Sequence, residues 1–259
     1  MQAKKSYGQH FLKNDQIAAR IAGSLRQAES TGRVLEVGPG TGMLTKHLLS
    51  ANTYAVYAVE ADRDMVAYLE LHYPALREHL IFKDFLDFNP NELFDGHNFC
   101  LIGNFPYNIS TQILFKLLDY RHWIPEMVGM FQKEVADRIV SGPGSKVYGI
   151  TSVLAQAFYR TEYLFTVERG SFHPPPKVLS AVIRLTRKEN FELGCNEKLF
   201  RQIVKTAFNQ RRKMLRNSLK PFFPAETLMA DPFFEKRPEV LDWEAYVRLT
   251  QAVEKASDN

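Results

Sequence analysis

The sequence predicts an α/β protein in which a mostly parallel β-sheet, covered by helices, is followed by a small all-helical C-terminal domain. Between residues 10 and 188, short apolar runs alternate with segments whose apolar residues recur at helical spacing, and this alternation is typical of a parallel sheet. After residue 188 only the helical spacing remains. We therefore expect two domains, residues 1–188 and residues 189–259.

The elements of the first domain follow from local signals. Asn14 is a good N-cap, and Ile17, Ile21 and Leu25 follow it at helical spacing. The same spacing predicts further helices at residues 43–50, 65–73, 111–120, 133–140 and 151–158. Short apolar runs predict strands at residues 33–37, 54–59, 80–82, 99–102, 127–131, 163–167 and 181–185. A Gly-Pro-Gly break at residues 142–144 interrupts the pattern.

The second domain begins with a helical pattern at Leu199. We expect the stretch 211–220 to continue as helix until Pro221 and Pro224 interrupt it, and residues 243–253 to form a last helix.

Charge is unevenly distributed, although the net charge is only +4. Residues 201–220 carry seven Lys and Arg and no acid, which indicates a polyanionic partner rather than a solvated helix face. The side chains expected to bind phosphates there and near the N-terminus are Arg211, Arg212, Lys213, Arg216, Lys4 and Lys5.

Several classes of protein are disfavoured. The cysteines Cys100 and Cys195 cannot build a disulfide framework, and no Cys/His cluster indicates a metal. No run approaches the length of a membrane span, and the polar N-terminus lacks the apolar core of a signal peptide. We expect a cytoplasmic protein that binds no metal and no membrane, and that acts as a monomer.

A glycine-rich turn after the first predicted strand indicates a nucleotide cofactor. Gly38, Gly40 and Gly42 follow residues 33–37 directly and lead into a helix, so the backbone can approach a ligand closely. A dinucleotide loop needs G-x-G-x-x-G, whereas here the third glycine comes one position early. The G-x-G-x-G spacing resembles the loop of S-adenosylmethionine (SAM)-dependent methyltransferases. Glu36 beside it suits a cationic ligand better than a pyrophosphate.

Two further acids follow neighbouring strands. Glu60 ends the second strand, where a carboxylate can accept both ribose hydroxyls of a cofactor. Asp84 follows the third, where an acid can accept from an adenine amine. Because parallel strands end at one edge of the sheet, these acids are expected to share a crevice with the glycine turn.

The segment Asn104-Phe105-Pro106-Tyr107, at the end of the fourth strand, suits the recognition of a flat amine. The Asn104 side chain offers a carbonyl acceptor. Pro106 favours an extended Phe105, whose own carbonyl can then point outward. Tyr107 offers a face for base stacking, and Phe172, before a proline run, is a candidate second face.

Taken together, these residues resemble the rRNA adenine dimethylase family, most closely its small-subunit branch. The matching stretches span nearly the whole chain and are residues 8–12, 36–42, 59–64, 104–110, 132–135, 172–178 and 208–213. The chain departs from the family at Phe105, where Leu is usual, and at His10, where Asn is usual.

The resemblance implies a Rossmann-like SAM-dependent methyltransferase domain and a helical domain that docks on RNA. It implies cofactor contacts from His10, Leu12, Gly38, Glu60, Asp84 and Asn104, to which the glycine turn adds Glu36 and Gly40. The implied activity is dimethylation of the exocyclic amines of two adjacent adenosines near the 3′ end of 16S rRNA, in the small ribosomal subunit or its precursor.

Three other interpretations remain open at this point. The chain could belong to the macrolide-resistance type of large-subunit rRNA methyltransferase, although the stretch 208–219 favours the small-subunit branch. It could be a non-catalytic RNA-binding assembly factor, against which Asn104, Tyr107 and Glu60 argue. A nicotinamide oxidoreductase is disfavoured by the glycine spacing.

Overall fold

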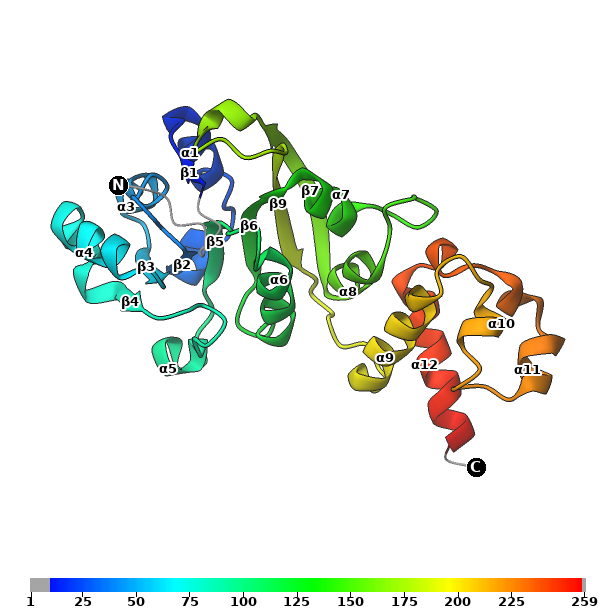
Figure 1. Ribbon diagram of the computed structural model, residues 1–259. Coiled ribbons are helices and arrows are strands. Elements are labelled where there is room, and N and C mark those ends of the chain that lie inside the picture. Colours follow the sequence, from blue (N-terminus) through cyan, green and yellow to red (C-terminus); the bar gives the residue numbers. More distant parts are fainter. Residues whose placement is uncertain (1–9, 258–259) are drawn as a thin grey trace. The chain divides into compact units, whose positions relative to one another are not determined.

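The computed structural model describes residues 10–257 and confirms the predicted α/β class (Figure 1). The chain divides into two compact units. The first contains the residues up to Ala136 together with Thr161–Arg187, and the second contains Asp137–Arg160 together with the chain from Lys188 onward. The predicted division into functional domains at residues 188 and 189 stays a prediction.

The first unit is built on a seven-stranded sheet with the order β4-β3-β2-β5-β6-β9-β7. Its strands are β2 (Arg33–Val37), β3 (Ala55–Glu60), β4 (Leu80–Phe82), β5 (Cys100–Asn104), β6 (Glu126–Gln132), β7 (Tyr159–Val167) and β9 (Ser180–Arg187). Strands β4, β3, β2, β5 and β6 are mutually parallel, and β9 pairs antiparallel with β6. Chain order reverses between β2 and β5, which is where open α/β sheets bind ligands.

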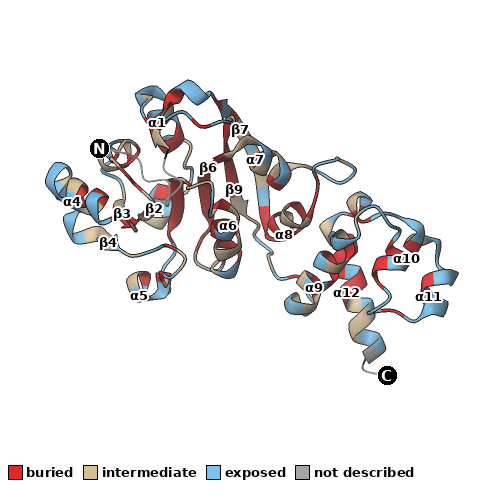
Figure 2. Cartoon of the chain, in the orientation of Figure 1, coloured by how far each residue is buried: buried red, intermediate tan, exposed pale blue. Residues whose placement is uncertain are grey.

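Both faces of this sheet are buried. Val34, Cys100 and Ile102 point into a core that they share with helix α1 (Asp15–Ala22) and helix α3 (Thr45–Ser50). The intervening Leu35 and Leu101 are also fully buried, so they must be covered from the opposite side. Continuous apolar strands of this kind are expected for a parallel sheet with helices on both faces, and Figure 2 shows its central strands as buried.

The remaining elements of this region are mostly those that the spacing predicts. The helices are α4 (Arg63–His72), α6 (Ser110–Asp119), α7 (Lys133–Val140) and the short α2 (Ala28–Thr31) and α5 (Pro90–Phe94). A two-stranded ribbon was not predicted: β1 (Phe11–Leu12) pairs antiparallel with β8 (Phe172–His173). Two-residue strands carry no periodicity, so the sequence could not reveal this pairing.

The second unit is helical. Helix α8 (Ile150–Phe158) packs against α9 (Glu197–Asn209) and α12 (Trp243–Ser257), with α10 (Leu215–Ser218) and α11 (Ala225–Ala230) between the last two in sequence. No helix within residues 10–257 is long and apolar enough to cross a membrane.

The prediction of one helix running through residues 211–220 is wrong. Helix α9 ends at Asn209, residues 210–213 form a turn, and Met214 is extended before the short α10. The backbone N–H of Leu215 donates to the Lys236 carbonyl instead of to the preceding turn. Tertiary pairing therefore overrides the local helical preference of this basic stretch.

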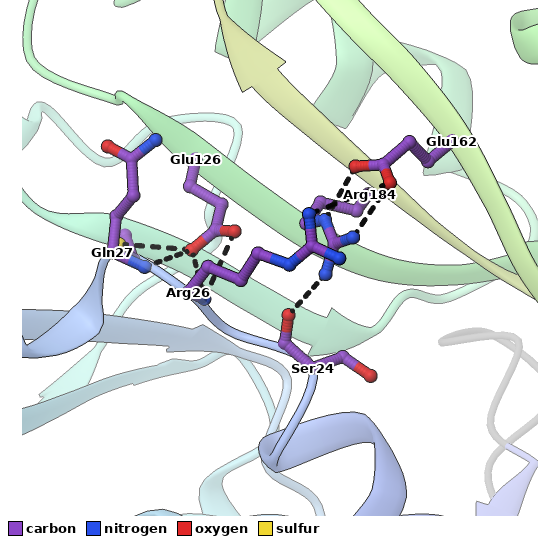
Figure 3. A network of polar contacts seen from close by, with 7 residues as sticks. Ser24, Arg26, Gln27, Glu126, Glu162 and Arg184 are labelled. Carbon is purple, nitrogen blue, oxygen red and sulfur yellow. Dashed lines mark hydrogen bonds and ion pairs between the residues drawn. The ribbon is translucent and has the colours of Figure 1, made fainter.

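A buried polar network ties the segment after α1 to the sheet (Figure 3). Glu126 is fully buried, and its carboxylate accepts from the backbone N–H groups of Arg26 and Gln27 at 2.8–3.1 Å. Arg184, which is 3% exposed, forms a bidentate pair with Glu162 and donates to the Ser24 carbonyl. The network therefore holds residues 24–27, which connect α1 to α2, against β6 and β9.

We expect Glu126→Ala to destabilise the protein by about 2 kcal/mol, because it removes the buried carboxylate that accepts from two partly buried backbone N–H groups. Urea unfolding measures this as a lower midpoint. Glu168→Ala, at an exposed position, is the matched control. Equal midpoints for the two variants would show that the network contributes nothing measurable.

Candidate functional site

A cavity of about 230 Å³ lies at the carboxyl ends of the parallel strands. It is lined by the ends of β2, β3 and β5, by the turns that follow β2, β4 and β5, and by the segment 10–12. Most residues predicted to form the site line this cavity: His10, Leu12, Glu36, Gly38, Gly40, Glu60, Asp84, Asn104, Phe105, Pro106 and Tyr107.

The glycine turn requires glycine at its critical positions. Gly38 and Gly40 have φ values of 66° and 56°, which side-chain-bearing residues rarely adopt. A Cβ on Gly40 would lie 3.1 Å from the Phe11 ring, which also lines the cavity. The backbone of the glycine turn therefore forms part of the cavity wall, and Phe11 of the N-terminal segment packs on this turn.

Glu36 is a desolvated carboxyl in the cavity wall. It is 1% exposed and accepts one hydrogen bond, from Thr45 Oγ1 at 2.6 Å. Burial, and then the nearby Glu60 carboxylate, raise the pKa of Glu36 to about 8, although the Thr45 hydrogen bond acts in the opposite direction. The side chain is therefore largely protonated at neutral pH until a cation approaches it.

Glu60 and Asp84 differ in their surroundings. The Glu60 carboxylate is buried and accepts from the backbone N–H groups of Gly40 (3.0 Å) and Asp62 (2.9 Å). Burial raises the pKa of Glu60, while these hydrogen bonds lower it. Asp84 is exposed, and its Oδ1 accepts from the Leu86 N–H. Each carboxylate keeps lone pairs for a ligand, because a carboxylate can accept about four hydrogen bonds.

Asn104 is oriented by the N-terminal segment. Its Nδ2 donates to the His10 main-chain carbonyl at 3.0 Å. That bond uses the donor end of the amide. Within residues 10–257 no hydrogen bond occupies Asn104 Oδ1 or the Phe105 carbonyl. Both residues line the cavity, and both oxygens are left unused by the described chain.

The Phe105 ring occupies a slot made by two glycines. Gly103 and Gly129 are paired across β5 and β6, and a Cβ on either would lie within 2.7 Å of this ring. The ring also packs edge-on against Phe131 at 5.1 Å. Phe105 lines the cavity although the residue as a whole is only 1% exposed.

Tyr107 is held from two sides. Its hydroxyl hydrogen-bonds to Ser180 Oγ, and its ring lies 5.3 Å from the His10 imidazole. His10 Nδ1 lies 2.8 Å from the Pro174 carbonyl, and since a carbonyl can only accept, Nδ1 carries the proton. Burial raises the pKa of Tyr107, so its phenol stays neutral at physiological pH.

Other predicted site residues lie elsewhere. Phe172 is 1% exposed, belongs to the core and is paired with Leu12, so it does not line the cavity. Arg211 donates to the Ser145 carbonyl and Arg216 contacts Glu235 at 3.4 Å, whereas Arg212 and Lys213 are exposed. Lys4 and Lys5 lie outside the described residues.

Sequence reasoning missed several residues of the site. Phe11 and Phe85 line the cavity, Thr45 contacts Glu36, and Ser180 contacts Tyr107. Phe85 directly follows Asp84 and could have been noticed. Ser180 could not, because it lies 73 residues from Tyr107 in sequence. Within the described residues, no group of three or more His, Cys, Asp or Glu side chains could hold a metal.

Curated relatives match the chain over nearly its whole length. A protein of Phocaeicola vulgatus named ribosomal RNA small subunit methyltransferase A is 55% identical, covering 99% of this chain and 91% of the relative. The protein of the same name from Flavobacterium johnsoniae is 54% identical, covering 98% and 97%.

Solved structures show the same fold. A dimethyladenosine transferase from Plasmodium falciparum is similar with a TM-score of 0.79 and 27% identity, covering 96% of this chain and 98% of that one. The 23S rRNA methyltransferase ErmE has a TM-score of 0.70 and 25% identity, covering 94% and 99%. The profile of one family, described as ribosomal RNA adenine dimethylase, matches residues 1–245. The chain therefore belongs to the ribosomal RNA adenine dimethylase family.

Proposed function

We propose that this protein transfers methyl groups from SAM to the exocyclic amines of two adjacent adenosines near the 3′ end of 16S rRNA. Membership of the family confirms the predicted enzyme class and cofactor, a SAM-dependent rRNA adenine dimethyltransferase. The names of the relatives support the small subunit as the substrate. The observation that carries the chemistry is that Asn104 lines the cavity with its amide nitrogen already bonded to the His10 carbonyl, which leaves its oxygen for a ligand.

The residues of the cavity fit this cofactor. Glu36 and Glu60 are buried carboxyls with raised pKa values, and within the described chain no ion pair compensates them. A ligand that brings positive charge and hydroxyl donors would satisfy both. We assign the ribose hydroxyls to Glu60, the adenine amine to Asp84 and the cationic end to Glu36. When bound, SAM supplies an electrophilic methyl group on a sulfonium.

Asn104 and Phe105 would act on the substrate amine. An adenine amine is a poor nucleophile because its lone pair is delocalised into the ring. If Asn104 Oδ1 and the Phe105 carbonyl accept hydrogen bonds from the two N–H groups of the amine, they orient its nitrogen toward the methyl group. They also favour a pyramidal geometry at this nitrogen. Most of the acceleration then comes from positioning. The methylated ammonium is acidic and loses its proton to water without a strong base.

Tyr107 would stack on the substrate adenine after the adenine has left the stacked bases of the RNA. Unstacking costs a few kcal/mol, and stacking on an aromatic ring offsets about 1–3 kcal/mol of that. The contacts of Tyr107 with His10 and Ser180 keep its ring in place beforehand. Segment 10–12 covers one side of the cavity and so helps to exclude water.

The helical region 189–259 is proposed to dock on rRNA through exposed cations such as Arg212 and Lys213. The substrate would be the small subunit or its precursor in the cytoplasm, with the enzyme acting as a monomer.

The decisive experiment incubates the protein with radiolabelled SAM and either unmodified small subunits or naked large-subunit rRNA. Label on the small subunit alone, located by mass spectrometry as two adjacent dimethyladenosines, is the expected result. Label on the large-subunit rRNA would favour the macrolide-resistance type, which the similarity to ErmE brings into consideration. No label on either would favour a non-catalytic assembly factor.

Asn104→Ala should lower turnover at least about 100-fold, because it removes a preorganised acceptor. The affinity for SAM, measured by calorimetry, should change far less. Asn98→Ala, at an exposed position before β5, is the matched control. Turnover near that of the control would show that Asn104 is not the acceptor.

SAM binding should release a proton below pH 8. The pKa of Glu36 is raised to about 8 in the free protein, and an approaching cation favours the carboxylate, so binding displaces the proton. Affinity should therefore rise with pH, approaching tenfold per unit well below pH 8, and level off above it. Calorimetry in buffers of different ionisation enthalpy measures the release. Glu36→Gln should abolish the proton release on SAM binding. If this variant releases as many protons as the wild type, the proton comes from another group.

His10 should act as a positioning residue for Asn104 and Tyr107. His10→Ala should lower kcat about tenfold with little change in KM for SAM, because the cavity loses the ring that packs on Tyr107. His10→Asn, which keeps a donor for the Pro174 carbonyl, should recover part of the loss. A raised KM for SAM with unchanged kcat would instead make His10 a cofactor ligand.

A further inference from the structure

The side chain of Arg211 is engaged within the second unit. Its Nη2 donates to the Ser145 carbonyl at 3.1 Å, and Arg211 is only partly exposed. The next residues, Arg212 and Lys213, are exposed, and within residues 10–257 neither forms an ion pair. Three consecutive cations, which the sequence presents as one phosphate-binding group, therefore differ in what they can do.

The hydrogen bond from Arg211 joins it to the loop formed by residues 142–147. Several other hydrogen bonds hold this loop to the chain around it. The base of the loop is held by Gln156, whose Nε2 donates to the Ser141 carbonyl at 2.8 Å. Further along, the Gly144 N–H donates to the Glu239 carbonyl at 2.7 Å, and the Ser145 carbonyl also accepts from the Tyr148 N–H. An exposed loop with this many internal bonds has few alternative conformations.

The loop ends in an aromatic anchor. Tyr148 is fully buried and packs edge-on against Phe208 at 6.1 Å. Between this anchor and Ser145 lie Lys146 and Val147, both exposed, and Lys146 has no ion pair among the described residues. The Arg211–Ser145 bond places this pair of residues beside the turn that carries Arg212 and Lys213.

We propose that Lys146, Arg212 and Lys213 form one RNA-binding surface, hereafter the loop–turn surface, and that Arg211 positions it rather than contacting RNA. The partner is the phosphate backbone of the rRNA substrate, so the inference rests on the proposed function. Cationic side chains on a rigid backbone lose less conformational entropy on binding phosphates than those on a mobile loop, because only the side chains remain to be ordered. One guanidinium nitrogen of Arg211 is used to hold the loop.

The test measures the affinity of the full-length protein for unmodified small subunits over a range of KCl concentrations. Lys146→Ala should weaken binding about three- to tenfold at low salt and reduce the slope of log affinity against log salt by about one. The double variant Arg212→Ala, Lys213→Ala should reduce the slope by about two. Lys198→Ala, an exposed lysine at the far end of α9, should leave both unchanged.

A double-mutant cycle tests the role of Arg211. Arg211→Ala should weaken binding about as much as Lys146→Ala, and should add little to it when both are combined, because Arg211 acts only by holding Lys146 in place. Hydrogen exchange at residues 144–147 should become faster in Arg211→Ala and stay unchanged in Lys146→Ala. Fully additive losses would mean that Arg211 contacts phosphate itself, which overturns the positioning role.

Three other outcomes would overturn either the RNA-binding surface or the proposed function, and they can be told apart. An unchanged affinity and salt slope for Lys146→Ala would remove the loop from the RNA surface. A loss of affinity for subunits but not for protein-free 16S rRNA would assign the surface to a ribosomal protein and also overturn the proposal. If the wild-type protein transfers no methyl group to these subunits, the proposed function fails instead, whatever the binding variants show.

Discussion

The hydrogen bond from Asn104 Nδ2 to the His10 carbonyl is the interaction on which the site depends. It joins the end of a central strand to a segment 94 residues away in sequence. The two ends of an amide are alike in shape, but one donates and the other accepts hydrogen bonds. Because this bond engages the donor end, the acceptor end is the one left for a ligand. The N-terminal segment is in turn held by β8 and by the Pro174 carbonyl. The proposed recognition of the amine is thereby coupled to the segment that lines the cavity.

Much of the architecture could be predicted because it follows from periodicity and from the chemistry of strand ends. Strands β2 and β4 have the predicted bounds, and α7 spans the predicted residues. Parallel strands bring their carboxyl ends to one edge whatever their distance in sequence. Glu36, Glu60 and Asn104 could therefore be placed in one cavity from local signals alone.

The remaining features depend on contacts between distant segments, which leave no local pattern. The turn after α9 is fixed by a bond from Leu215 to Lys236, so a helix was expected where none forms. Phe172 precedes a proline run that indicates rigidity, but the pairing of its strand turns the ring into the core. Arg211 has the same local context as Arg212, and only the folded chain distinguishes them. Sequence reveals the chemistry that a residue offers, and tertiary structure decides which partner uses it.

The glycine slot beneath Phe105 has an evolutionary consequence. A methyl group on Gly129 would lie 2.2 Å from the ring, so alanine cannot replace this glycine while Phe105 stays in place. Gly103 is constrained by more than the ring, because its Cβ would also lie 2.7 Å from the Val37 carbonyl oxygen. Glycine is therefore required at position 103 whatever residue stands at 105. Position 129, in contrast, is coupled to position 105: a side chain can be added there only together with a smaller residue in place of Phe105.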